Sequence, residues 1–174
     1  MNLRILLTLL ALPLLACQPN SKEASAPTGD TTLPVEIRQM LDRYEQVGLT
    51  LAADSTTGIA DASQSMIAAA NKFVNSGASA VEKAAVMSVA PVAQTLLQAT
   101  QSNDIAMVRS SFGDLSRAMV SLAQAFPSMH TEHMLMQCPM VTTGFNQWIQ
   151  RQGKIRNPYK GRAMIDCGSK QDWQ

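Results

Sequence analysis

The chain has 174 residues, and its 14 basic and 13 acidic residues leave a formal net charge of +1. The basic residues are scattered and form no patch, which argues against nucleic acid as a partner. Only two Trp, two Tyr and four Phe stand beside abundant Ala, Met, Leu and Val. That composition favours packed helices over a β-sandwich.

The first residues have the layout of a secretory signal peptide over residues 1–16, in which Arg4 precedes an apolar run that ends at Leu15. The run is too short for a membrane-spanning helix, which needs roughly 20 apolar residues. It continues into Leu-Leu-Ala-Cys at 14–17, which resembles a bacterial lipobox. The resemblance implies cleavage before Cys17 and acylation of that cysteine. An ordinary cleaved signal with an incidental cysteine is the alternative.

Acyl chains on Cys17 would hold the protein on a membrane, because each buried methylene contributes about 0.8 kcal/mol. Gln18 rather than Asp follows the cysteine. By the sorting rule for such lipoproteins, this favours the outer membrane of a Gram-negative bacterium, with the protein facing the periplasm. Residues 17–32 then comprise the lipidated cysteine and a flexible tether. Residues 33–174 remain for one domain.

Apolar residues that recur with helical spacing predict four helices before residue 130. These apolar faces begin at Ile37, Ile59, Ala85 and Ile105. Ser79 and Glu82 match a capping box before the third helix, and Pro91 predicts a kink or break inside it. The expected fold is all-α, an antiparallel up-and-down four-helix bundle with an irregular Cys/Met-rich C-terminal segment packed on it.

The C-terminal segment, residues 128–168, holds both histidines, two of the three cysteines and five of the eleven methionines. Thiolate and thioether sulfur select copper(I), and imidazole also suits copper. We therefore expect copper(I), or silver(I), as the bound ion and no organic cofactor. The candidate metal ligands are Cys138, Met140, Met164, Cys167, Met134, Met136, His130 and His133. Alternatively, Met134, Leu135 and Met136 cover the open end of the bundle and the histidines are solvated.

Four short blocks follow one another in this segment. They are Cys-Pro-Met at 138–140, Trp148, Ile-Arg-Asn-Pro-Tyr-Lys-Gly at 155–161 and Met-Ile-Asp-Cys-Gly at 164–168. Together they resemble a bacterial periplasmic family catalogued as a domain of unknown function. That family occurs alone in secreted proteins and lipoproteins, and fused to adaptor subunits of CusB-type copper and silver efflux pumps. The resemblance implies a helical bundle with this tail, and heavy-metal handling in the cell envelope.

Two interpretations of Cys138 and Cys167 remain open. In an oxidising compartment the pair predicts a disulfide. Such a bridge would stabilise the fold by about 3 to 4 kcal/mol in the chain-entropy model. Alternatively, both cysteines stay reduced and bind copper(I) with Met140 and Met164, which lie near them in the sequence.

The leading functional hypothesis is a non-catalytic copper(I)/silver(I)-binding lipoprotein that buffers metal or delivers it to a heavy-metal efflux system. The alternative is a scaffold or interaction lipoprotein whose tail is stapled by a Cys138–Cys167 disulfide. An enzyme, such as a copper oxidase or a thiol oxidoreductase, is disfavoured. The chain has no Cys-x-x-Cys and no His-rich multicopper pattern.

Overall fold

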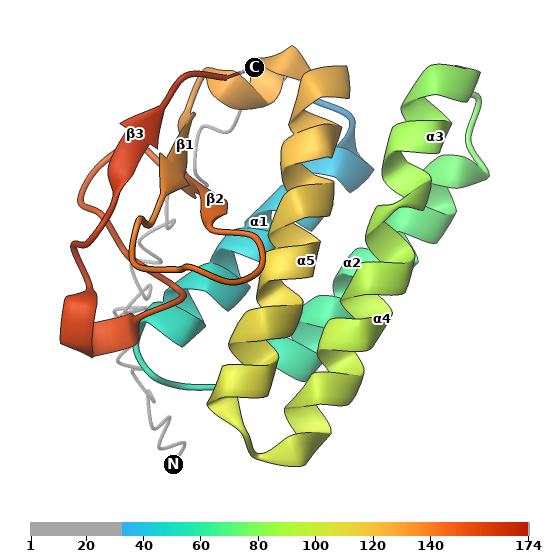
Figure 1. Ribbon diagram of the computed structural model, residues 1–174. Helices are drawn as coiled ribbons and strands as arrows, with labels where there is room; N and C mark the ends of the chain where they lie inside the picture. The colour runs from blue at the N-terminus through green and yellow to red at the C-terminus, as the bar shows by residue number, and fades with distance from the viewer. Residues whose placement is uncertain (1–32, 174) are drawn as a thin grey trace, which may run out of the picture.

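The computed structural model describes residues 33–173, which form helices followed by a small sheet (Figure 1). The predicted signal peptide, the lipidation site Cys17 and the tether lie outside the described residues. Within the described part of the chain, no helix is long and apolar enough to cross a membrane.

The helices are α1 (Val35–Ala52), α2 (Ile59–Val74), α3 (Ala80–Met87), α4 (Val89–Ala99) and α5 (Ile105–Ala125). Short 3-10 turns cover Thr100–Ser102, Pro127–His130 and Gly161–Met164. Successive long helices run in opposite directions through short connections (Figure 1). The expectation of a mostly helical fold is confirmed.

The predicted third helix is divided into α3 and α4. Ser79 and Glu82 form the expected capping box, in which the Glu82 N–H donates to Ser79 Oγ and the Ser79 N–H donates to the Glu82 carboxylate. The division falls at Ser88, three residues before Pro91. A proline ring in a helix clashes with the carbonyl four residues earlier, here that of Met87. The helix therefore ends at Met87 and restarts at Val89.

The all-α prediction is wrong for the C-terminal segment, which is not irregular. It forms a three-stranded antiparallel sheet in the order β2-β1-β3. The strands are β1 (His133–Gln137), β2 (Gln147–Arg151) and β3 (Ser169–Gln171). In the register, Leu135 lies opposite Ile149 on one side and Gln171 on the other.

The sheet escaped prediction because β1 is buried on both faces. Successive strand residues point to opposite faces, yet His133, Leu135 and Met136 are all at most 6% exposed. An alternation of apolar and polar residues, which marks a half-buried strand, is therefore missing.

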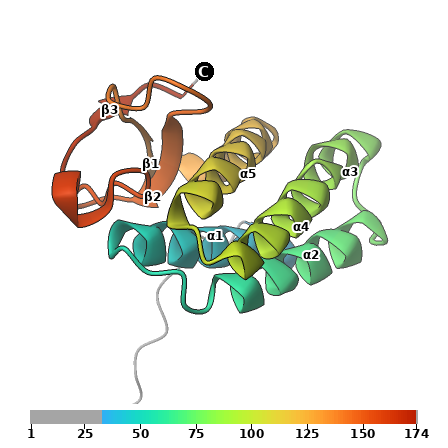
Figure 2. The same ribbon diagram turned by 60° about the horizontal axis from the view of Figure 1, so that its bottom comes forward.

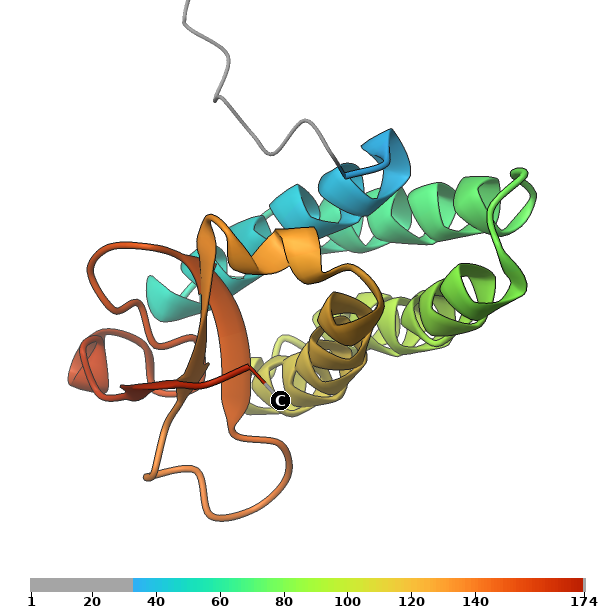
Figure 3. The same cartoon turned by 90° about the horizontal axis from the view of Figure 1, so that it is seen from above.

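The helices form two layers, and the sheet lies beside α1 and α5 at one side of them (Figures 2 and 3). One hydrophobic core joins the two parts. At its centre Tyr44 of α1 stacks on Phe112 of α5 with ring centroids 5.2 Å apart. The Tyr44 hydroxyl also shares a 2.7 Å hydrogen bond with Ser116 and accepts one from the Ile149 N–H of β2. These contacts fix the sheet, and the segment that carries the cysteines, on the helices.

Candidate functional site

The two C-terminal cysteines lie side by side, with 3.8 Å between the Sγ atoms, and both are free thiols. Cys138 follows β1 and Cys167 lies two residues before β3. The pairing of Gln137 with Ser169 brings these strand ends together. The Cys138 N–H donates to the Asn146 carbonyl at 2.9 Å, which fixes the first thiol. Cys138 is fully buried, whereas Cys167 is half-buried.

Asn157 shapes the turn that carries the second thiol. Its side-chain amide donates to the Cys167 carbonyl at 2.6 Å, and its backbone N–H donates to the Ile165 carbonyl at 2.8 Å. Its Oδ1 accepts the N–H groups of Tyr159 and Lys160. Asparagine suits this position because its side chain imitates backbone hydrogen bonds in turns. The Asn-Pro-Tyr block thus holds the Cys167 backbone in place.

Arg109 of α5 anchors the same turn on the helices. Its Nε donates to the Pro158 carbonyl at 3.0 Å. Its Nη2 donates to the Leu51 carbonyl at 2.9 Å and to Asp54 Oδ1 at 2.6 Å. Arg109 therefore ties the tail to the end of α1 with charge-assisted hydrogen bonds. Because the Asp54 carboxyl accepts a hydrogen bond from Arg109, its pKa is lowered below the ordinary value.

Gly161 allows the tail turn to lie close to Asp54 and Arg109. Its φ is +60°, and a Cβ at this position would overlap both the Asp54 carboxylate and the Arg109 guanidinium. The next residue continues the contact, since the Arg162 N–H donates to Asp54 Oδ2 at 3.1 Å. Only glycine fits both the backbone conformation and the space.

Trp148 of β2 lies beneath the second cysteine loop. Its indole is 1% exposed and donates to Gln150 Oε1 at 3.0 Å. It meets the Tyr159 ring edge to face with centroids 6.0 Å apart. A Cβ on Gly168, the residue after Cys167, would lie 2.7 Å from the indole. Trp148 therefore anchors the tail on the helices.

The predicted methionine ligands occupy different environments. Met134 and Met136 share one face of β1, and Met136 is 2% exposed within the core. Met164 is half-buried in the turn before Cys167, and Met140 is 51% exposed two residues after Cys138. Met140 also lines a surface groove of about 390 Å³ beside α5. Along the chain, Met136 and Met140 are each two residues from Cys138 and Met164 is three residues from Cys167, but Met136 is buried in the core.

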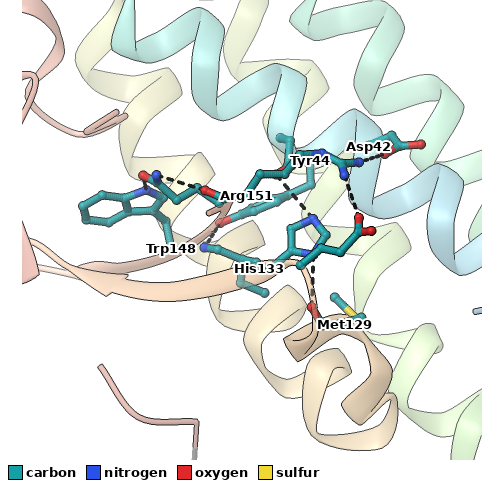
Figure 4. Close-up of polar contacts among 10 residues, drawn as sticks. Asp42, Tyr44, Met129, His133, Trp148 and Arg151 are labelled. Carbon is teal, nitrogen blue, oxygen red and sulfur yellow. Dashed lines mark hydrogen bonds and ion pairs between the residues drawn. The ribbon is translucent and has the colours of Figure 1, made fainter. Parts of the chain in front are cut away.

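The two histidines have separate partners. The His130 ring stacks on Trp173, with centroids 4.0 Å apart and planes 8° apart, and its Nε2 lies 3.1 Å from the Ala123 carbonyl. Burial lowers the pKa of His130. His133 is 6% exposed, and its Nδ1 lies 3.0 Å from the Met129 carbonyl. Its Nε2 points toward Glu45 Oε1 at 3.4 Å (Figure 4).

An ion-pair cluster that the sequence did not predict surrounds Arg151 at the end of β2. Its guanidinium contacts Glu45 at 2.9 Å, and Asp42 and Glu132 at 3.0 Å each. Burial by itself would lower the pKa of Arg151. The three carboxylates outweigh that effect and raise the pKa above its ordinary value. Figure 4 shows Arg151 reaching from the sheet to Asp42 on α1. Asp42 and Glu45 lie more than a hundred residues from Arg151, so no local spacing signals the cluster.

The described part of the chain contains no group of three or more His, Cys, Asp or Glu side chains arranged to hold a metal ion. The donor set that the structure brings together is therefore the dithiol Cys138–Cys167. Burial, followed by the hydrogen bond with Cys138, raises the pKa of the Cys167 thiol. Both a metal ion and an oxidant would have to displace thiol protons from this pair.

The 3.8 Å separation of the two sulfurs suits metal binding without rearrangement, but it is too long for a disulfide. Two thiolates, each about 2.3 Å from a tetrahedral zinc ion, lie about 3.8 Å from one another, and a thiolate pair at this separation can share one metal ion. A disulfide needs a separation of about 2.05 Å. The pair can therefore chelate an ion as it stands, whereas bridge formation moves the sulfurs closer by about 1.8 Å.

These features define a mostly helical protein that holds a dithiol on a small docked sheet. The family model described as "Protein of unknown function (DUF3347)" matches residues 40–131, just over half of the chain, and the chain belongs to that family. The match covers most of α1 and all of α2 to α5 and ends before Cys138, so it does not extend to the four tail blocks. No curated protein and no solved structure matches the chain.

Proposed function

We propose that the protein is a non-catalytic, lipid-anchored protein of the cell envelope that binds copper(I) or silver(I), with Cys138 and Cys167 as its principal ligands. The observation that carries this proposal is the 3.8 Å separation of the two free thiols. Soft monovalent ions prefer thiolate and thioether sulfur. The proposed role is to buffer the ion or to deliver it to a heavy-metal efflux system.

The surroundings of the thiols suit transfer of an ion rather than permanent storage. Cys138 is buried and Cys167 is half-buried, so one ligand faces the interior and the other faces the surface. An incoming donor can replace Cys167 first, while Cys138 still holds the ion. Met164 and Met140, each within three residues of one of the cysteines, are the proposed supplementary donors. The histidines and Met136 are engaged elsewhere, which narrows the proposed ligand set.

Copper(I) titration against a competing chelator tests the proposal. The protein carries Cys17→Ser, so that only two thiols remain, and is fully reduced under anaerobic conditions. Wild-type thiols should withdraw one ion per chain from a chelator of micromolar affinity. Replacing Cys138 and Cys167 with Ser should abolish that competition. If the double variant competes as well as the parent, the proposed site is wrong.

Substitution of methionines tests whether thioethers bind the ion, and two methionines elsewhere in the chain supply a matched control. Replacing Met140 and Met164 with Leu should weaken retention of the ion and change its ultraviolet charge-transfer band. Met87 and Met107 are 62% and 50% exposed and lie on helices rather than beside the thiols. Their Leu variants remove as many sulfurs but should leave affinity unchanged. An equal effect of both pairs would remove the methionines from the site.

A scaffold function remains a second candidate because the tail is a structured surface fixed on the helices by Arg109 and Asn157. In this candidate a Cys138–Cys167 disulfide would staple the recognition surface. Mass spectrometry of protein isolated from the cell envelope distinguishes the two candidates. An intact bridge with no copper or silver retained would support the scaffold.

A further inference from the structure

The two cysteines differ in their exposure to solvent. Cys138 is 0% exposed and belongs to the buried core, whereas Cys167 is half-buried and packs against that core. Gly168, the residue after Cys167, lies directly against the edge of the Trp148 indole. Of the two cysteines, only Cys167 is partly exposed to solvent in the folded protein, so a reagent from solvent should meet Cys167 before Cys138.

We infer that Cys167 is the thiol that exchanges with external disulfides and that Cys138 is the resolving thiol. The substrate class is a small or flexible disulfide, for which oxidised glutathione serves as the probe. This inference goes beyond the proposed metal function and does not depend on it, since the reaction takes place in metal-free protein.

The reaction consists of two exchanges. The Cys167 thiolate attacks one sulfur of the external disulfide, whose S–S bond breaks, and the first external thiol leaves. The Cys138 thiolate then attacks the Cys167 sulfur in the mixed disulfide, and the second external thiol leaves. The protein loses two electrons and two protons. The external disulfide gains both and becomes two thiols.

The geometry favours the second exchange. The sulfurs are already in contact at 3.8 Å, so the resolving thiol needs no large backbone movement to reach its target. The Cys138 N–H bond to Asn146 and the Asn157 bond to the Cys167 carbonyl hold both backbones in place. The resolving step should therefore outpace the first step, and the mixed disulfide should not accumulate in the parent protein.

If both proposals hold, oxidation of the two cysteines also controls metal binding, because the same sulfurs take part in both. Closing the bridge converts two thiolate ligands into disulfide sulfurs, which are poor ligands for soft ions. Exchange at Cys167 would then release the bound ion, and reduction would restore the site.

The test uses reduced, metal-free full-length protein with Cys17→Ser, exposed to oxidised glutathione, quenched with acid, alkylated and analysed by mass spectrometry. The parent should lose two hydrogens and carry no stable adduct. Adding Cys138→Ser should trap one glutathione, which peptide mapping places on Cys167. Adding Cys167→Ser should leave Cys138 unmodified, with adduct formation at least about tenfold slower than in the Cys138→Ser protein.

Denatured samples of the two single-cysteine proteins supply the control. In guanidinium both cysteines should form adducts at similar rates, so that the difference in native protein reports access. The circular dichroism of each variant confirms that it is folded. Equal native rates for the two variants would overturn the inference, as would a parent protein that accumulates the adduct without closing the bridge. Because no metal is present, failure here leaves the copper(I) titration unaffected.

Discussion

Replacing Gly161 with Ala should detach the tail turn from the helices. The residue has a φ of +60°, and the added Cβ would overlap the Asp54 carboxylate and the Arg109 guanidinium. A left-handed backbone costs a residue with a Cβ roughly 1 to 2 kcal/mol. Displacing Arg109 also weakens its hydrogen bonds to the Pro158 and Leu51 carbonyls. Hydrogen bonds that involve a charged group contribute about 1.5 to 3 kcal/mol each.

Because Arg109 can shift without losing every bond, we expect Gly161→Ala to lower the free energy of unfolding by about 3 kcal/mol. In a domain of this size, that corresponds to a fall in melting temperature of roughly 6 to 12 °C. Urea unfolding followed by tryptophan fluorescence measures the change directly, because Trp148 is buried beneath the displaced turn.

Gly144→Ala is the matched control. Gly144 also has a positive φ, +79°, but a Cβ there would meet nothing within 4 Å. This variant carries the backbone penalty alone, so its cost should stay near 1 kcal/mol. The difference between the two glycines isolates the close approach of Asp54 and Arg109. If Gly161→Ala costs no more than Gly144→Ala, the docking role assigned to Gly161 is wrong.

Three further measurements test the surroundings of the site. Arg151→Met should lower the free energy of unfolding by about 2 kcal/mol, since it leaves Glu45 mostly buried without its cation. The Arg117–Asp114 pair, in which both side chains are more than half exposed, supplies the control, because Asp114→Asn should cost less than about 1 kcal/mol; equal costs would contradict the assignment. The lowered pKa of Asp54 means that its ion pair stabilises the fold above about pH 4, the unfolded-state pKa, and that this contribution is lost as pH falls through the folded-state pKa. The difference in unfolding free energy between the parent and Asp54→Asn should therefore shrink below about pH 4, and a difference that stays constant down to pH 2 would refute this. Finally, fully reduced protein should still shield Trp148 from acrylamide quenching; quenching that rises on reduction would show that the tail needs a bridge to stay docked.

The helices could be predicted from the sequence because each has one face toward the core. Ile37, Ile59 and Ile105 each begin an apolar stripe that the structure buries or half-buries. The Ser79 capping box and the effect of Pro91 are local in the sequence, so spacing alone identifies them. Physical rules that act within one or two helical turns were sufficient for this half of the fold.

The sheet and the ion-pair cluster could not be predicted in the same way. In β1 the buried side chains lie on both faces, which removes the alternation that identifies a strand. Arg151 meets Asp42 and Glu45 only after the sheet has docked on α1. The role of Gly161 depends likewise on Asp54, in the turn after α1, and on Arg109 of α5, both of which are distant in the sequence. Each of these features depends on contacts between residues that are far apart in the sequence, so no local sequence pattern reveals it.

The tail residues other than the sulfurs have structural roles, and that bears on what the sulfurs do. Asn157 holds the Cys167 carbonyl, Trp148 supports the loop from below, and Arg109 fastens the turn to the helices. None of these contacts requires a bond between Cys138 and Cys167. A disulfide would therefore not be needed to define the conformation of the tail, although it would still restrict the unfolded chain. This fixed tail, with two thiols in contact and one of them half-buried, is the basis on which we propose binding and exchange at sulfur.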